Sequence, residues 1–201
     1  MTHLQNIAVV VEDELSGAVM QRLIEASGRG FVIDRLINAR GYGQIKSGIE
    51  KFRSSSYALP HVILTDLDNY PCPPALLDNW GATELPPQCL VRIAVHEVEA
   101  WLLADREGIA EFLHVAVNKV PHAPEADADP KRTLINLARR SRKRRLAQEL
   151  VPSPNSSAQI GPLYNARLSE FVNESWNIDR ARLLADSLSR ALNRLSVFLS
   201  G

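Results

Sequence analysis

Ile7-Ala-Val-Val-Val11 leads directly into Glu12-Asp13-Glu14, and His61-Val-Ile-Leu-Thr65 leads directly into Asp66-Leu67-Asp68. Each pair joins a short apolar run, rich in β-branched residues, to a group of carboxylates. Such a run predicts a buried strand of an α/β sheet, in which ligands bind outside the carboxyl ends of the strands. We therefore expect the two acidic groups to meet at one edge of a sheet.

Carboxylates that converge on one point repel each other, and a hard divalent cation is the usual remedy. Asp66 and Asp68 are two residues apart on an extended chain, so both side chains can point to the same face. Alternatively, either aspartate caps the turn that follows. With Glu12 as the third acid, the pattern favours Mg²⁺- or Mn²⁺-dependent chemistry on phosphate groups.

The first half of the chain alternates strand-like and helix-like segments. Apolar runs predict strands at 6–11, 31–37, 61–65 and 90–95. Helical periodicity predicts helices at 14–27, near 45–54, and through 99–104. This alternation with short links predicts an α/β fold with a mostly parallel sheet and helices on both faces.

The second half has a helical pattern. The expected helices are at roughly 131–150, 162–174 and 178–199, with a polar linker from Pro152 to Pro162. We therefore expect an α/β core over residues 1–117 and a helical C-terminal portion over residues 118–201, packed on that core.

The composition is that of an ordinary globular protein, with 45% hydrophobic and 23% charged residues among 201. No run of about 18 apolar residues predicts a membrane span, and no secretory signal is visible. The only cysteines, Cys72 and Cys89, are too few for a disulfide scaffold. A cytoplasmic location is the simplest expectation.

The net charge is zero, but it is unevenly distributed. Residues 1–129 have a balance of −8, and residues 130–201 have a balance of +8. Much of the positive charge lies in one stretch, which we call the basic stretch and which predicts contacts to nucleic-acid phosphates: Arg139, Arg140, Arg142, Lys143, Arg144 and Arg145. The alternative is a solvated helix face or complementarity between the two halves.

Two families place an acidic cluster and a later aspartate at strand ends. The first is the response-regulator receiver. The segment Val9-Val-Val-Glu-Asp-Glu14 resembles the opening of that family, and Asp66 would then be the phospho-acceptor. The resemblance stops there. Leu-Asp-Asn-Tyr separates Asp66 from Pro71, and the fourth strand ends at Val95-His-Glu rather than at Ser or Thr.

The second family is the Toprim fold of topoisomerases, primases and nucleases. Its pattern is a glutamate after the first strand and Asp-x-Asp after a later one, which Glu12 and Asp66-Leu-Asp68 match. The segment Val91-Arg-Ile-Ala-Val-His-Glu-Val-Glu-Ala-Trp-Leu-Leu-Ala-Asp105 extends the match. With Asp129-Pro-Lys131 and Gly161-Pro-Leu-Tyr164, it resembles the Toprim-like domain-of-unknown-function family 4276 over nearly the whole chain.

That resemblance implies a small Toprim-type metal-dependent nuclease acting on RNA or DNA. Members of this family are similar to the effector subunit of certain anti-phage defence systems, in which an ABC-type ATPase restrains the nuclease. Glu12 matches the Toprim glutamate, and Asp66 and Asp68 match the metal-binding aspartates. Glu97 and Glu99 match the acidic pair of the family, and they too are expected metal ligands.

Lys131 is expected either to bind the scissile phosphate or to start a helix. With Glu12, Asp66 and Asp68 it completes the expected catalytic set. One departure from the Toprim pattern is Asp13, because many Toprim proteins have glycine there. The alternative function is a non-catalytic Toprim-like adaptor that binds a partner ATPase or nucleic acid. Whatever the function, the alternative for Glu97 or Glu99 is a role at the first turn of the helix after the fourth strand, where an acid suits the helix dipole.

Overall fold

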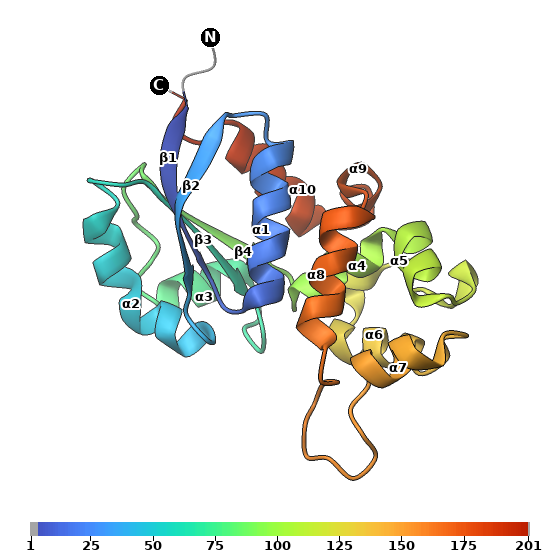
Figure 1. Cartoon of the computed structure of the whole chain (residues 1–201). Coiled ribbons are helices and arrows are strands. Elements are labelled where there is room, and N and C mark those ends of the chain that lie inside the picture. Colours follow the sequence, from blue (N-terminus) through green and yellow to red (C-terminus); the bar gives the residue numbers. More distant parts are fainter. Residues whose placement is uncertain (1–3, 201) are drawn as a thin grey trace. The chain divides into compact units, whose positions relative to one another are not determined.

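The computed structural model describes residues 4–200. Its centre is a sheet of four parallel strands in the order β2-β1-β3-β4 (Figure 1). The strands are β1 (Gln5–Val11), β2 (Phe31–Asn38), β3 (His61–Asp66) and β4 (Cys89–Ala94). The expected α/β class with a parallel sheet is confirmed.

The chain forms two compact units. Of the described residues, the first comprises 4–95 and 187–200, and the second comprises 96–186. The expected boundary after residue 117 falls inside the second unit. The last helix, which was expected in the C-terminal portion, belongs almost entirely to the first unit because it packs on the sheet.

The first unit buries its central strands on both faces. Residues 7–11 of β1 are at most 1% exposed, which explains their continuous apolar run. On one face, α2 (Tyr42–Ser55) and α3 (Pro73–Asn79) share a core with Val10, Ile63 and Ile93. On the other face, Gly17 of α1 (Glu14–Ala26) lies against Val11 and Leu36. Helices therefore cover both faces of the sheet (Figure 1).

The second unit is helical. It contains the 3-10 turns η1 (Val117–Lys119) and η2 (Pro124–Ala126). Its α-helices are α4 (Val98–Ala104), α5 (Arg106–Leu113), α6 (Pro130–Ala138), α7 (Arg144–Leu150), α8 (Tyr164–Glu174) and α9 (Ile178–Ala181). Trp101, Tyr164 and Phe171 are at most 1% exposed and form the large buried side chains of this unit.

The helix expected at 131–150 is two helices, α6 and α7. A continuous helix would stack Arg139 on Lys143 and Arg140 on Arg144, and like charges four residues apart destabilise a helix. The Ser141 hydroxyl instead accepts a hydrogen bond from the backbone N–H of Lys143 at 3.0 Å and stabilises a turn. The basic stretch itself therefore breaks the helix.

The helix expected at 178–199 is also interrupted, giving α9 and α10 (Asp186–Ser196). The Asn177 side chain caps α9 by accepting from the N–H of Arg180 at 2.9 Å. The N–H of Asp186 donates to the carboxylate of Glu125 at 2.8 Å. Leu183, between the two helices, is 81% exposed, so it adds nothing to a continuous apolar face.

No helix within residues 4–200 combines the length and the apolar character that crossing a membrane requires.

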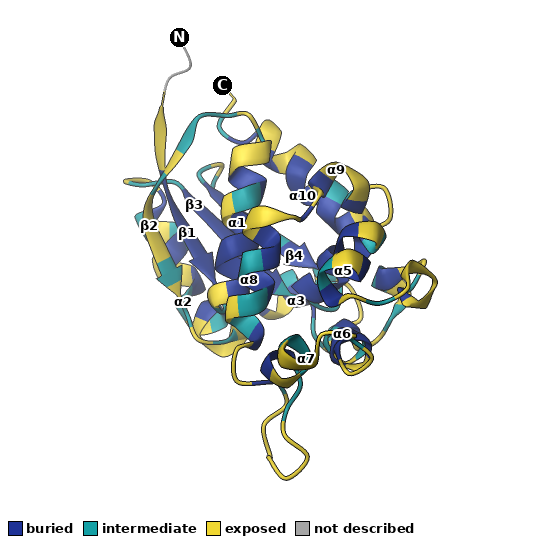
Figure 2. Cartoon of the chain, turned by 45° about the vertical axis from the view of Figure 1, so that its right-hand side comes forward, coloured by how far each residue is buried: buried dark blue, intermediate teal, exposed yellow. Residues whose placement is uncertain are grey.

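An exposed loop over residues 152–160 joins α7 to α8 (Figure 2). At its end the N–H of Gly161 donates to Leu150 O, and the N–H of Leu163 donates to Glu149 O, both at 3.0 Å. A Cβ on Gly161 would collide with the backbone of Glu149, Leu150 and Val151. Glycine is required there because its neighbours are backbone atoms that cannot rotate away.

We expect Gly161→Ala to lower the stability of the chain by about 2 kcal/mol, because the added methyl group overpacks a closed backbone contact. This corresponds to a fall in melting temperature of about 6 °C. Gly43→Ala is the matched control, since a Cβ there meets nothing within 4 Å and lies in α2. It should raise the melting temperature slightly, because alanine favours helix. Equal melting temperatures for the two variants would contradict this account.

Candidate metal site

Glu12 joins the ends of the two central strands of the first unit. It follows β1, and its Oε1 accepts a hydrogen bond from the Thr65 hydroxyl at 2.6 Å. The same oxygen accepts from the backbone N–H of Asp66 at 2.9 Å. Thr65 and Asp66 are the last residues of β3. The carboxyl ends of β1 and β3 thus meet at this carboxylate, as the sequence predicts.

Burial raises the pKa of the Glu12 carboxyl above its ordinary value. The hydrogen bonds from Thr65 and Asp66 act in the opposite direction, while the negative charges of Asp68 and Asp13 add to the rise. The ionised form of Glu12 is therefore costly in the protein by itself. A cation beside it would remove that cost.

The Asp-x-Asp segment is held in place by its central residue. Leu67 is 4% exposed in the core, and its N–H donates to Ala94 O of β4 at 2.9 Å. Asp66 and Asp68 on either side of it are half-buried. Asp68 has a left-handed backbone with φ of 48°, a conformation that is uncommon outside glycine and that concentrates at functional sites.

Asp13 and Glu14 belong to the start of α1 rather than to the acidic pocket. The Asp13 side chain caps the helix by accepting from the N–H of Ser16 at 2.8 Å. Glu14 is exposed in the first turn, where a negative charge suits the helix dipole. Of the three acids after β1, Glu12 is the one that reaches β3.

The donor set fits a hard cation such as Mg²⁺. Within residues 4–200 no three or more His, Cys, Asp or Glu side chains form a ready-made metal cluster. Mg²⁺, however, usually binds through one or two carboxylates and keeps waters and substrate phosphates as its other ligands. Glu12 accepts a hydrogen bond from the N–H of Asp66 and lies near the negative charge of Asp68. This arrangement of a few carboxylates matches the usual Mg²⁺ site better than a site made of protein ligands alone.

The acids Glu97 and Glu99 belong to the second unit, where the structure places them with Lys131. The Lys131 ammonium lies 2.8 Å from Glu97 Oε1 and 3.6 Å from Glu99 Oε1. The backbone N–H of Lys131 donates to Glu97 Oε2 at 3.0 Å. Glu99 is 2% exposed and accepts from the Tyr164 hydroxyl at 3.1 Å. These residues, expected from separate motifs, form one cluster.

Lys131 both starts a helix and holds its ammonium within this cluster. Lys131 is the second residue of α6, so it starts a helix, and Glu97 accepts the N–H that the helix leaves unbonded at this position. Its side chain is 29% exposed, and its ammonium is paired with Glu97.

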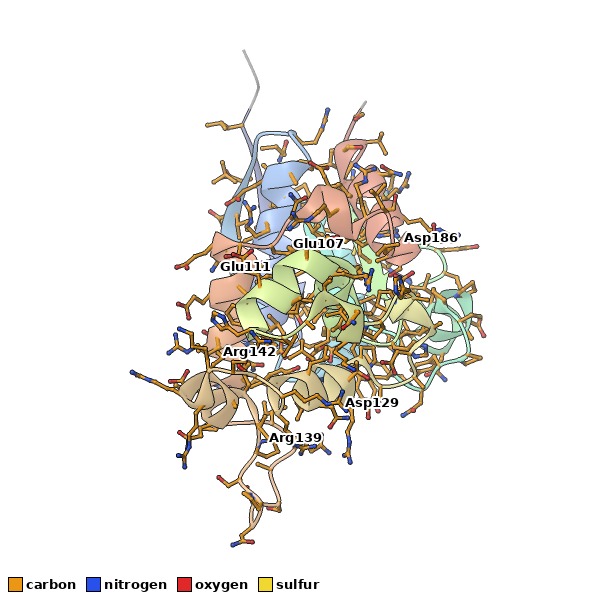
Figure 3. All side chains as sticks on the ribbon, turned by 90° about the vertical axis from the view of Figure 1, so that its right-hand side faces the viewer. Glu107, Glu111, Asp129, Arg139, Arg142 and Asp186 are labelled. Carbon is orange, nitrogen blue, oxygen red and sulfur yellow. The ribbon has the colours of Figure 1, made fainter. Side chains whose placement is uncertain are left out.

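The basic stretch is exposed along its whole length. Arg139 directly follows α6, and Arg142 lies in the turn after it (Figure 3). Arg145 lies in α7 and pairs with Glu149 at 3.0 Å. Arg139 and Arg144 line a cavity of about 640 Å³ with Pro152 and Pro154. These cations therefore lie on the turn after α6 and on the first residues of α7, and they do not form one face of a single helix.

The sequence patterns do not identify Thr65 and Tyr164 as functional residues. Each donates its hydroxyl hydrogen bond to a candidate acid, Thr65 to Glu12 and Tyr164 to Glu99. A threonine directly before a strand-end aspartate was a signal for the first. Tyr164 was noted only as part of a motif, because 65 residues separate it from Glu99.

No protein-family model matches the chain, and no curated protein matches it. The resemblance to family 4276 therefore remains a prediction from the motifs. One solved structure, the C-terminal region of the OLD protein of Xanthomonas campestris pv. campestris, is similar over 91% of this chain and 98% of that chain. The identity is 20% and the TM-score is 0.36.

Proposed function

We propose that this chain is a Toprim-type nuclease that hydrolyses phosphodiester bonds of RNA or DNA with Mg²⁺ or Mn²⁺. The observation that carries the proposal is the Glu12 carboxylate, desolvated and bonded to the end of β3 beside the negative charge of Asp68. An acid with a raised pKa at the carboxyl ends of parallel strands is typical of a catalytic centre. The Toprim motifs of the sequence point to the same centre.

Asp66 and Asp68 would hold one or two metal ions, which stabilise charge on the phosphoryl oxygens and activate water. Glu12 would act as general base or as a further ligand. Its raised pKa suits a base, because a base works best when its pKa approaches the working pH. Thr65 would hold the Glu12 carboxylate in position through its 2.6 Å hydrogen bond.

The second unit has its own group of charged residues. Lys131 would bind a phosphate of the substrate, and Glu97 and Glu99 would orient its ammonium or contribute to metal binding. The basic stretch would follow the nucleic-acid backbone, because phosphate contacts supply affinity but little sequence information. An ABC-type ATPase that restrains the nuclease in anti-phage defence is the partner that the family resemblance implies.

The test is cleavage by the purified chain. Labelled single-stranded DNA, duplex DNA and RNA would be incubated with Mg²⁺, with Mn²⁺ or with EDTA. We expect cleavage of at least one of the three with either metal and none in EDTA, because the acids cannot neutralise developing phosphate charge by themselves. Cleavage of the same substrate in EDTA would contradict the metal-dependent mechanism.

A non-catalytic adaptor is the second candidate. The observation in its favour is that Lys131 and Glu97, both expected at the catalytic site, are already paired with each other at 2.8 Å. As an adaptor, the chain would gain thermal stability from Mg²⁺ through Glu12 and Asp68 but would cut none of the three substrates. The same preparations therefore decide between the two functions.

A further inference from the structure

Three arginines of the first unit come together away from the acids described above. Arg92 lies on β4, and Arg190 and Arg194 lie four residues apart on α10, so they share one side of that helix. None of the three belongs to the basic stretch, and although Arg92 lies in the segment Val91–Asp105, the sequence assigned it no role.

The packing of α10 explains why they meet. The N–H of Val95, directly after β4, donates to the Ser187 hydroxyl near the start of α10 at 3.2 Å. Beyond the end of α10, the Phe198 ring lies 6.0 Å from Phe31 at the start of β2. The helix therefore runs opposite to the strands, from their carboxyl ends back towards their amino ends.

This direction sets the level of each arginine. Arg92 lies three residues before Val95, about 10 Å back along the strand. Arg190 and Arg194 lie three and seven residues after Ser187, about 4.5 and 10.5 Å along the helix. Ile93 belongs to the core on the α2 and α3 side, so Arg92 points to the opposite face of the sheet.

Arg92 lies within reach of the positive charges of Arg190 and Arg194. Burial, and then the positive charges of Arg194 and Arg190, lower the pKa of Arg92 from its ordinary value. The Arg92 Nε is enclosed and donates no hydrogen bond to any residue between 4 and 200. Arg190 and Arg194 are exposed, so a ligand has access to the cluster from solvent.

We propose that Arg92, Arg190 and Arg194 form a phosphate-binding site on the first unit. Guanidinium groups match phosphate oxygens in paired hydrogen bonds, and a bound dianion would offset the repulsion that Arg190 and Arg194 exert on Arg92. The phosphate belongs either to a nucleic-acid backbone or to a small free phosphate compound. The site does not depend on the proposed nuclease activity.

Two measurements on the full chain test the site and distinguish the two sources. The first is the shift in melting temperature caused by inorganic phosphate, relative to chloride at equal ionic strength. The second is the affinity for a single-stranded DNA of about 20 nucleotides, measured in EDTA so that no cleavage interferes. The variants are Arg92→Met, which fills similar space, and Arg194→Gln, which changes only an exposed side chain. The matched control is Lys51→Gln, an exposed cation on α2 on the other face of the sheet.

We expect both arginine variants to weaken phosphate or DNA binding at least about five-fold, the loss of one charge-assisted contact, and the control to change it less than two-fold. Weakening of both probes, or of DNA alone, assigns the site to a nucleic-acid backbone, and weakening of phosphate alone assigns it to a free phosphate compound. Arginine variants that bind both probes like the wild type, or a control that loses as much affinity, would overturn the proposal.

Discussion

Glu12→Gln is expected to reduce metal-dependent cleavage at least about 100-fold while raising the melting temperature of the metal-free protein. The amide oxygen can still accept from Thr65 and from the N–H of Asp66, so the local structure is retained. The charge that serves as base or metal ligand is lost, and such groups contribute about 10²–10⁴ in rate. Steady-state cleavage and thermal unfolding in EDTA measure the two effects.

The rise in stability follows from the pKa of Glu12. Because the folded protein raises this pKa, the folded state holds the proton more tightly than the unfolded chain does. Wild-type stability from this group is complete below the unfolded pKa and is lost as the pH rises through the folded pKa. Glutamine has no such loss, so the advantage of Glu12→Gln should appear at neutral pH and vanish in acid.

Glu14→Gln is the matched control, because it removes the same charge two residues away from an exposed position. It should leave cleavage unchanged and should lower stability slightly through the helix dipole. Mg²⁺ should stabilise the wild type and Glu14→Gln but stabilise Glu12→Gln less. Glu12→Gln that cuts at the wild-type rate would remove Glu12 from the mechanism.

Local sequence patterns predict the centre of this fold well. Residues 7–11 of β1 and 62–64 of β3 are buried on both faces and are all apolar, so the strand ends stand out against the acids that follow. The meeting of Glu12 with the end of β3 follows from parallel pairing alone. The local roles of Asp13 and Glu14 at the start of α1 follow from capping rules.

Features that depend on contacts distant in sequence could not be predicted. The start of α10 involves Glu125, 61 residues from Asp186. Arg92 is a single cation in an apolar strand pattern, and only the return of α10 along the sheet brings Arg190 and Arg194 to it. The helical periodicity also continues through Leu184, whose side chain is 42% exposed. A pattern registers apolar spacing but not whether a partner surface exists.

The second unit depends on a buried carboxylate that the sequence shows only as the end of a motif. Asp105 is 0% exposed. Its Oδ1 accepts from Arg180 Nε at 2.7 Å and from the N–H of Gly108 at 3.2 Å, and its Oδ2 accepts from the N–H of Asn177 at 2.8 Å. One side chain thus caps α5 and fixes the segment that begins α9.

Asp105→Ala is therefore expected to destabilise the protein by about 3–5 kcal/mol, because it leaves a guanidinium and two backbone N–H groups without their acceptor. That is a large part of the roughly 5–15 kcal/mol that stabilises a typical domain. Glu107→Ala is the matched control, because Glu107 faces the same Arg180 at 3.6 Å but is 67% exposed. Its loss should cost about 0.5 kcal/mol or less, since solvent screens exposed ion pairs. Urea unfolding of both variants measures the difference. Similar midpoints would show that the charge of Arg180 alone matters, whereas a large gap would identify the buried hydrogen bonds of Asp105 as the stabilising contacts.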